Sequence, residues 1–231
     1  QSLTTADGKG VVVGLVLTWR VSDVAKFLLT SGSTGEPKAV ITTHRMLTSN
    51  QVQLREVLRF LIDDPPAIVD WLPWNHVFGG SHNTGLVLYN GGTMYLDDGR
   101  PLPGAGIAAT VRNLMDIAPT VYFNVPKGFE MLVPHLERDA ALRERFFSRL
   151  HCYFFAGAGL SAHVWGALDA LAVKQTGARL PMLTGLGATE SAPFALSATP
   201  QNSRSGMVGL PAPGVELKLV PVAGKLEARL K

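Results

Sequence analysis

The stretch Thr30-Ser31-Gly32-Ser33-Thr34-Gly35-Glu36-Pro37-Lys38 stands between two apolar runs, Phe27 to Leu29 and Ala39 to Ile41. The apolar runs are typical of β-strands, so we expect this stretch to be a loop between two strands. Its glycines let backbone N–H groups turn toward a ligand, and its hydroxyls and lysine can complete a cradle for phosphate oxygens. A solvated Ser/Gly turn is the plain alternative. The flanking strands and the Pro-Lys ending favour a phosphate-binding loop.

This loop differs from the common P-loop, in which G-x-x-x-x-G-K-[ST] opens a helix. Gly32 and Gly35 are three residues apart, Lys38 follows three residues after Gly35, and a β-like run comes next. The spacing therefore indicates a nucleotide-binding loop of another kind.

The composition of the 231 residues is that of a folded globular protein, with 46% hydrophobic and 17% charged residues. The net charge is only +3, and no cluster of Lys and Arg concentrates it, so nucleic acid is not an expected partner. No early apolar run is long enough to span a membrane, and the polar first ten residues lack the basic start of a signal peptide.

The single cysteine, Cys152, excludes an internal disulfide and fits a reducing compartment, so we expect a cytoplasmic protein. It begins the run Cys152-Tyr153-Phe154-Phe155, which is typical of a buried strand. A structural thiol is therefore a better interpretation than a nucleophile.

Helix-like and strand-like segments alternate along most of the chain. Helical spacing, caps and breakers predict helices at about 46–61, 81–89, 107–117, 127–136, 140–150 and 162–175. Short apolar runs predict strands at 67–69, 93–96, 121–125, 152–155, 182–183, 215–220 and 226–230. The alternation predicts an α/β core around a mostly parallel sheet, with a β-rich piece from about residue 205. Ligands of such sheets bind beyond the carboxyl ends of the strands, where the unusual loops should gather.

A second chemically rich stretch runs from Thr184 to Pro193, with the sequence Thr-Gly-Leu-Gly-Ala-Thr-Glu-Ser-Ala-Pro. Its glycines allow a flat ligand to approach the backbone, Thr189 offers a hydroxyl, and Glu190 offers a carboxylate oxygen for Mg²⁺. Taken alone, Thr189 could equally cap a helix. Combined with the glycine-rich loop at Thr30–Lys38, the stretch becomes a strong indication of a nucleotide site.

Together these stretches resemble the adenylate-forming, or AMP-binding, family of acyl- and aryl-CoA synthetases, adenylation domains and luciferases. The Leu72-Pro73-Trp74-Asn75-His76 segment is similar to that family's Leu-Pro-x-x-His segment, and Gly157-Ala158-Gly159-Leu160-Ser161 resembles its adenine-side loop. The resemblance runs from about Lys26 to Glu227. It implies the layered αβαβα core of the family's large N-terminal domain.

A narrower resemblance points to feruloyl-CoA synthetases, which activate hydroxycinnamic acids such as ferulate. It rests on three runs of sequence, at 70–76, 85–93 and 119–130. The resemblance implies an acid–thiol ligase of phenylpropanoid degradation that uses ATP, Mg²⁺ and CoA and takes a small carboxylic acid as its substrate.

The resemblance also implies roles for individual residues. The phosphate-binding loop would consist of Thr30, Ser31, Gly32, Ser33, Thr34, Gly35 and Lys38. The α-phosphate would contact Thr189, Mg²⁺ would bind Glu190, and the adenine pocket would be lined by Gly157, Ala158, Gly159, Gly185, Leu186 and Gly187. His76 would lie between the acid and the nucleotide, and the candidates for an aryl pocket are Phe78, His82, Phe123, Asn124 and Pro193. Phe123 fits a plain core position equally well.

The chain departs from the family pattern in two ways. Leu186 stands where many relatives carry a tyrosine that stacks on adenine. The sequence also resembles only the middle of such an enzyme: residues 1–204 would be a partial α/β core, residues 205–231 would start a truncated β-rich subdomain, and the C-terminal lid domain would be absent. We therefore expect the 231-residue chain alone to bind nucleotide weakly at best and not to complete the reaction. Exposed apolar edges would favour a homo-oligomer.

Three other interpretations remain open. The first is an adenylation domain that loads a carrier protein, and the second is a medium-chain fatty acyl-CoA ligase. The third is a nucleotide-binding module without catalytic activity.

Overall fold

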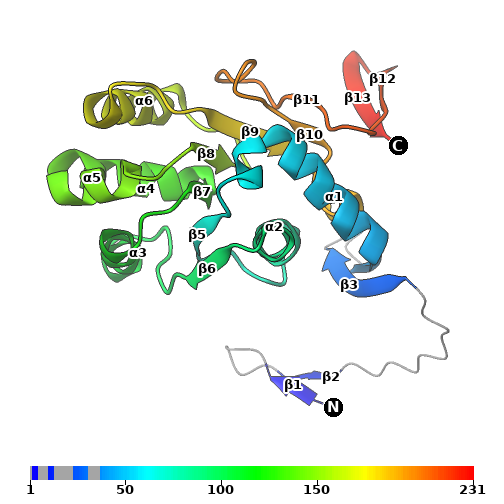
Figure 1. Cartoon of the computed structure of the whole chain (residues 1–231). Helices are drawn as coiled ribbons and strands as arrows, with labels where there is room; N and C mark the ends of the chain where they lie inside the picture. The colour runs from blue at the N-terminus through cyan, green and yellow to red at the C-terminus, as the bar shows by residue number, and fades with distance from the viewer. Residues whose placement is uncertain (1, 5–9, 13–22, 31–36) are drawn as a thin grey trace.

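The computed structural model describes residues 2–4, 10–12, 23–30 and 37–231, and Figure 1 shows the alternation of strands and helices that the sequence predicts. The strands are β1 (Ser2–Thr4), β2 (Gly10–Val12), β3 (Val24–Thr30), β4 (Lys38–Thr43), β5 (Ala67–Asp70), β6 (Thr93–Leu96), β7 (Val121–Asn124), β8 (Cys152–Phe155), β9 (Met182–Leu186), β10 (Leu196–Ser197), β11 (Leu210–Pro211), β12 (Leu217–Val222) and β13 (Lys225–Leu230). The α-helices are α1 (His44–Val57), α2 (Thr84–Asn90), α3 (Ala105–Asp116), α4 (Pro126–Arg138), α5 (Ala140–Phe147) and α6 (Ala162–Thr176). Three short helical segments are η1 (Arg59–Ile62), η2 (Phe78–Asn83) and η3 (Thr189–Ser191).

The central sheet has the order β11-β10-β9-β8-β7. Its strands β7, β8 and β9 run parallel, whereas β10 runs antiparallel to β9 and β11 antiparallel to β10. The parallel pair β5–β6 lies beside β7, because the backbone N–H of Thr120 donates to the carbonyl of Ala67 over 2.9 Å. The predicted α/β class is confirmed, and the sheet is mixed at its β10–β11 side.

Alternation of side chains along β7 and β8 divides the core into two layers, because successive residues of a strand point to opposite faces. Tyr122 and Tyr153 pack in the core formed with α3, α4, α5 and α6. Phe123, Cys152 and Phe154 pack in the core formed with α1 and α2. Helices therefore cover both faces of the sheet, as Figure 1 shows, and the continuous apolar run of β8 is explained by burial on both sides.

Local signals set several helix ends. The Ser161 hydroxyl accepts a hydrogen bond from the Val164 N–H at the start of α6, and Gly177 ends that helix in the left-handed conformation with φ of 78°. The Thr43 hydroxyl accepts from the Met46 N–H at the start of α1. The predicted caps at Ser161 and Gly177 are confirmed.

The helix predicted at 81–89 begins earlier than expected. A π-helix, η2, covers Phe78–Asn83 and leads into α2. Its glycines lie against the preceding loop: a Cβ at Gly80 would be 1.9 Å from the carbonyl oxygen of Trp74. The 3.6-residue pattern did not show this start, because a π-helix closes its turns over five residues and the close approach needs glycine.

The glycine-rich loop does connect two strands, as predicted. β3 and β4 form an antiparallel hairpin in which Thr30 pairs with Lys38, and residues 31–36 of the loop lie outside the described residues. At the other end of the chain, β12 and β13 form an exposed antiparallel hairpin that follows the last helical segment.

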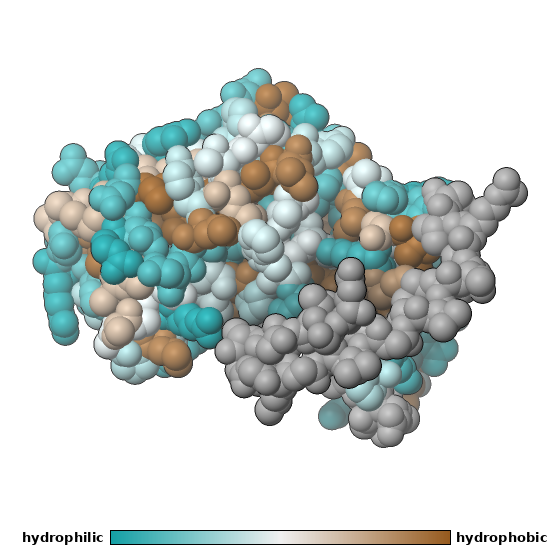
Figure 2. All heavy atoms as spheres, turned by 90° about the horizontal axis from the view of Figure 1, so that it is seen from below, coloured by the Kyte–Doolittle hydropathy of each residue, from teal (hydrophilic) through white to brown (hydrophobic). Residues whose placement is uncertain are grey.

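Exposed hydrophobic side chains are present on the described surface. Figure 2 shows hydrophobic residues between hydrophilic ones on the lower face, and the exposed side chains of α2 and β6 include Leu88, Tyr89, Tyr95 and Leu96. Such surface is compatible with self-association, and the homo-oligomer remains a prediction. Within the part of the chain that the structure describes, no helix has the length and apolar character needed to cross a bilayer.

Candidate nucleotide and acid site

The predicted site segments follow the carboxyl ends of neighbouring strands. In the parallel register, Asn124 at the end of β7 pairs with Phe155 at the end of β8, and Phe155 pairs with Thr184 of β9. The end of β5 reaches the same edge, because the indole N–H of Trp71 donates to Asn124 Oδ1 over 3.2 Å. The topology therefore places the loops after β5, β7, β8 and β9 on one rim, as the sequence predicted.

The two predicted adenine-side loops present backbone at this rim. Gly157, Ala158 and Gly159 are exposed after β8, and Gly157 has a φ of 91° that a side chain would strain. In the loop after β9, a Cβ on Gly187 would lie 1.3 Å from the Pro193 carbonyl oxygen, so only glycine fits. Leu186 beside it is 43% exposed. These positions can offer backbone groups and one apolar side chain to a flat ligand.

The structure describes only the two ends of the predicted phosphate-binding loop. Thr30 is half-buried at the end of β3, Lys38 is exposed at the start of β4, and the predicted Ser31, Gly32, Ser33, Thr34 and Gly35 lie outside the described residues. β4 lies beside η3, which carries Thr189 and Glu190. The fold thus brings the strand that begins with Lys38 next to the second predicted nucleotide segment.

Thr189 does not cap η3. The cap hydrogen bond is made by Ser191, whose hydroxyl accepts from the Ala188 N–H over 2.9 Å. Glu190 is exposed, and in the described ranges no group of three or more His, Cys, Asp or Glu side chains could hold a metal. One carboxylate fits Mg²⁺ that arrives with a nucleotide, because Mg²⁺ is commonly held by one or two carboxylates together with substrate phosphates.

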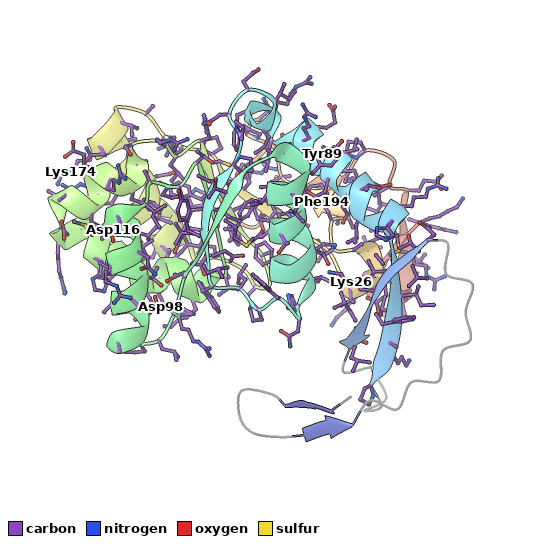
Figure 3. All side chains as sticks on the ribbon, turned by 60° about the horizontal axis from the view of Figure 1, so that its bottom comes forward. Lys26, Tyr89, Asp98, Asp116, Lys174 and Phe194 are labelled. Atoms are coloured by element: carbon purple, nitrogen blue, oxygen red, sulfur yellow. The ribbon has the colours of Figure 1, made fainter. Side chains whose placement is uncertain are left out.

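His76 lies at the rim with an exposed ring. Its Nδ1 accepts a hydrogen bond from the Phe78 N–H over 3.2 Å, so the neutral ring carries its proton on Nε2. An outward N–H of this kind can donate to a carboxylate or phosphate oxygen. The backbone after His76 is linked to the β3–β4 hairpin, because the ammonium group of Lys26 on β3 donates to the Gly80 carbonyl over 2.8 Å. Figure 3 labels this lysine.

His82 has a different environment, with 2% of the residue exposed. Burial lowers its pKa to about 4, although the hydrogen bond with Asn83 acts in the opposite direction. His82 Nδ1 lies 2.8 Å from Asn83 Oδ1, and Asn83 Nδ2 donates to Asp70 Oδ2 over 3.1 Å. Asp70 is also buried, and burial raises the pKa of its carboxyl. These three residues connect the end of β5 to η2.

The predicted aryl-pocket residues Phe78, His82 and Phe123 lie together inside the core on the α1–α2 side of the sheet. The ring centroids of His82 and Phe123 are 5.1 Å apart, and those of Phe78 and Phe123 are 6.3 Å apart. Phe154 and Phe194 complete the cluster. Phe123 is only 2% exposed. Phe123 therefore occupies a core position in the described structure. An aryl-pocket role for this residue stays a prediction.

Both ends of the Asn124 side-chain amide form hydrogen bonds with neighbouring residues. Its Oδ1 accepts from the Trp71 indole and from the Val125 N–H, and its Nδ2 donates to the Tyr122 hydroxyl. Its side chain is therefore a brace between β5 and β7 as the structure stands. Pro193 is half-buried beside Phe194.

The buried neutral His82 predicts acid sensitivity. The pKa of His82 is about 4 in the folded protein and 6.5 in the unfolded chain. As the pH falls below 6.5, the unfolded chain binds a proton that the folded protein does not bind, so the free energy of unfolding decreases. Between pH 7 and pH 4, we expect wild type to lose about 3 kcal/mol of unfolding free energy more than His82→Phe loses. Denaturant unfolding of both proteins at each pH measures this; equal losses would contradict it. Asp70 is present in both proteins, so its own titration cancels in the comparison to first order.

A pocket of about 550 Å³ lies at the opposite end of the strands and contains none of the predicted site residues. It is lined where β8 and β9 begin, by residues that include Phe60, His151, Cys152 and Pro181. Burial raises the pKa of the Cys152 thiol to about 12, so this cysteine is not a thiolate at neutral pH. The structural interpretation of Cys152 agrees with both observations.

Sequence reasoning did not select five residues that the structure brings to the site. They are Lys26, Asp70, Asn83, Phe154 and Phe194. Asp70 is the last residue of the strand before the His76 segment, and Asn83 is the last residue of the helical segment that follows it. This placement is the one signal in the sequence that could have indicated these two residues.

The fold has an α/β sheet with glycine-containing loops at the carboxyl ends of its parallel strands. It belongs to the class of α/β proteins that bind ligands at this edge. The family described as AMP-binding enzyme matches residues 16–228, and the chain belongs to that family. 

Known relatives are similar over most of this chain. A "Long-chain-fatty-acid--CoA ligase" of Salmonella typhimurium is 32% identical over 86% of this chain and 33% of its own length. "Long-chain-fatty-acid--CoA ligase 2" of Schizosaccharomyces pombe is 27% identical over 88% of this chain and 34% of its own length. A solved malonyl-CoA ligase, in a ternary product complex with methylmalonyl-CoA and AMP, superposes with a TM-score of 0.66 at 26% identity, over 88% of this chain and 42% of that one. The chain thus spans about a third of the length of these curated relatives.

Proposed function

We propose that this chain is the nucleotide- and acid-binding part of an ATP-dependent acid–CoA ligase. The carboxylate of the acid attacks the α-phosphate of ATP to form acyl-AMP and pyrophosphate, and the thiol of CoA then displaces AMP. The observation that carries the proposal is the common rim. Loops of the kinds expected for adenine and acid follow strands that end at this rim, and β4, which begins with Lys38, lies beside η3 of the same rim, in a chain that the AMP-binding family matches at residues 16–228.

In this proposal, the residues act mainly by positioning groups and neutralising charge. Thr30 and Lys38 hold the departing pyrophosphate together with the loop between them, and Thr189 contacts the α-phosphate. Glu190 holds Mg²⁺, which shields the phosphate charges when bound. His76 donates from its outward Nε2–H to the acid carboxylate or the nucleotide. Ala158 and Leu186 face the adenine with the glycines around them.

For the acid, we propose a hydroxycinnamate such as ferulate. The packing on the α1–α2 side of the sheet supports a compact aromatic acid, because four phenylalanine rings and His82 fill the space between η2 and the strands. The long-chain ligases among the relatives favour a fatty acid, which is the second candidate.

The domain division also stays a proposal. Residues 1–204 form the α/β part and residues 205–231 begin a β-rich part, which agrees with the absence of helix after η3 in the described residues. Transfer to a carrier protein instead of CoA is the alternative for the second half-reaction.

The test is acid-dependent exchange of pyrophosphate into ATP by the protein that contains this chain. Ferulate, 4-coumarate, benzoate, octanoate and palmitate are compared, and CoA or a holo-carrier protein is then offered as the acceptor. Exchange with the cinnamates and thioester formation with CoA are expected. Exchange with the fatty acids alone would overturn the hydroxycinnamate assignment, and no exchange with any acid would overturn the ligase proposal.

A further inference from the structure

The segment 187–194 carries Thr189 and Glu190 and makes few hydrogen bonds to the rest of the protein. Within η3 its backbone bonds are local, such as the one from the Ala192 N–H to the Thr189 carbonyl over 3.3 Å. At its base, β10 pairs with β9. Among the residues that the structure describes, Asn50 on α1 is the only one outside this segment that forms hydrogen bonds with it. Apart from apolar packing, this one side chain therefore holds the segment in place.

The contact between Asn50 and the segment is buried and joins distant parts of the chain. The Phe194 N–H donates to Asn50 Oδ1 over 2.9 Å, and the two residues are 6% and 4% exposed. Figure 1 shows α1 beside β10, and Figure 3 labels Phe194. Since α1 follows directly after β4, which begins with Lys38, Asn50 links the β3–β4 hairpin to the segment of Glu190.

The orientation of the Asn50 amide is set by the groups around it. The Pro213 carbonyl can only accept, so the nitrogen Nε2 of Gln53 faces it over 2.8 Å. Gln53 Oε1 then accepts from Asn50 Nδ2 over 3.0 Å, which leaves Asn50 Oδ1 for the Phe194 N–H. Asn50 Nδ2 also lies 3.5 Å from the Phe194 carbonyl oxygen. A backbone acceptor at one end and a backbone donor at the other give these bonds a single consistent direction.

We propose that Asn50 is a positioning residue that holds the segment 187–194 so that Thr189 and Glu190 face the nucleotide phosphates and Mg²⁺. Asn50 acts through the backbone of Phe194 and does not touch the reacting groups. The inference rests on the proposed function, because it assigns the residue that orders the nucleotide side of the same site. Mg²⁺ requires near-ideal octahedral geometry, and Glu190 offers it a single carboxylate, so a shift of the segment weakens binding of the metal with its nucleotide.

The first experiment removes the hydrogen bonds and keeps the side-chain shape. In Asn50→Leu we expect the half-saturating Mg²⁺ concentration and the KM for ATP in pyrophosphate exchange to rise about tenfold. The KM for the acid should stay within about twofold of wild type, because the backbone after His76 is linked to β3 through Lys26 instead. Loss of folded protein alone would lower the rate and change none of these concentrations. Unchanged values for Mg²⁺ and ATP overturn the inference.

Two further variants separate this role from general packing of α1. Gln51→Leu is the matched control, because Gln51 is 4% exposed on the same helix and its Nε2 donates to the Ser81 carbonyl over 3.4 Å, away from the segment. It should keep the half-saturating Mg²⁺ concentration within about twofold of wild type. Gln53→Leu changes a half-buried residue and removes the partner of Asn50 Nδ2, so it should raise that concentration by about threefold. An equal rise in Gln51→Leu and Asn50→Leu contradicts the specific role of Asn50.

A third measurement does not depend on turnover. Hydrogen–deuterium exchange of the same protein, without nucleotide, reports the Phe194 N–H directly. Asn50→Leu should speed deuteration of this amide by at least about tenfold, and Gln51→Leu should leave it as in wild type. Equal deuteration in Asn50→Leu and wild type overturns the inference. Faster deuteration in Asn50→Leu of a protein that shows no pyrophosphate exchange with any acid would instead reject the ligase proposal and leave Asn50 as the residue that holds the segment.

Discussion

Lys38→Ala is expected to lower pyrophosphate exchange by about 10²–10³-fold, which is the usual cost of removing one group that stabilises charge in a transition state. Lys38 is the first residue of β4 and pairs with Thr30 across the hairpin, so its position relative to the loop is set by the strand register. β4 lies beside η3, the segment of Glu190. An ammonium group here neutralises phosphate charge that grows as pyrophosphate leaves, and alanine cannot replace it.

The control separates this loss from a loss of folding. Lys38 is exposed, so its replacement should change the free energy of unfolding by less than about 0.5 kcal/mol. Lys174→Ala removes an exposed lysine on α6, on the other side of the sheet (Figure 3), and should leave exchange unchanged. If Lys38→Ala lowers the rate of pyrophosphate exchange by less than about threefold at saturating ATP and acid, Lys38 does not bind the phosphates as proposed.

Local patterns predicted the elements of this fold well, because the responsible forces are local. Capping at Ser161, the left-handed Gly177 and the apolar run from Cys152 to Phe155 each act within a few residues. The antiparallel β10 and β11 were not predicted, since these strands have only two residues each and carry no periodic signal.

The site was predictable as a set of loops but not as a set of contacts. Parallel strands guarantee that their carboxyl ends meet at one edge, so the rim followed from the order of the elements. The bond between Asn83 and Asp70 joins residues thirteen positions apart in chain order, and it depends on the π-helical start of η2. Phe123 shows the same limit, because an aromatic residue on a buried strand fits a core and a pocket equally well until its neighbours are known.

Phe123→Ala is expected to lower the free energy of unfolding by about 3–5 kcal/mol, the usual cost of deleting a buried phenylalanine ring. The ring is 2% exposed at the centre of β7 and contacts Phe78, His82 and Phe154. For a chain of this size, the loss corresponds to a fall of about 10 °C in melting temperature. Thermal and denaturant unfolding measure it. Phe27→Ala, at a ring that is 44% exposed on β3, should cost less than about 1 kcal/mol and serves as the matched control.

The same variant tests how far the acyl group reaches. Deleting the Phe123 ring opens space beside His82, whose ring centroid is 5.1 Å away. If the acid enters this cluster, the kcat/KM of Phe123→Ala should shift toward bulkier ring acids or longer alkyl acids relative to 4-coumarate. If the protein is destabilised as expected and its acid preference does not change, Phe123 is a core residue that the acid does not reach. The aryl-pocket role would then be wrong, and the acid would have to bind nearer the exposed His76.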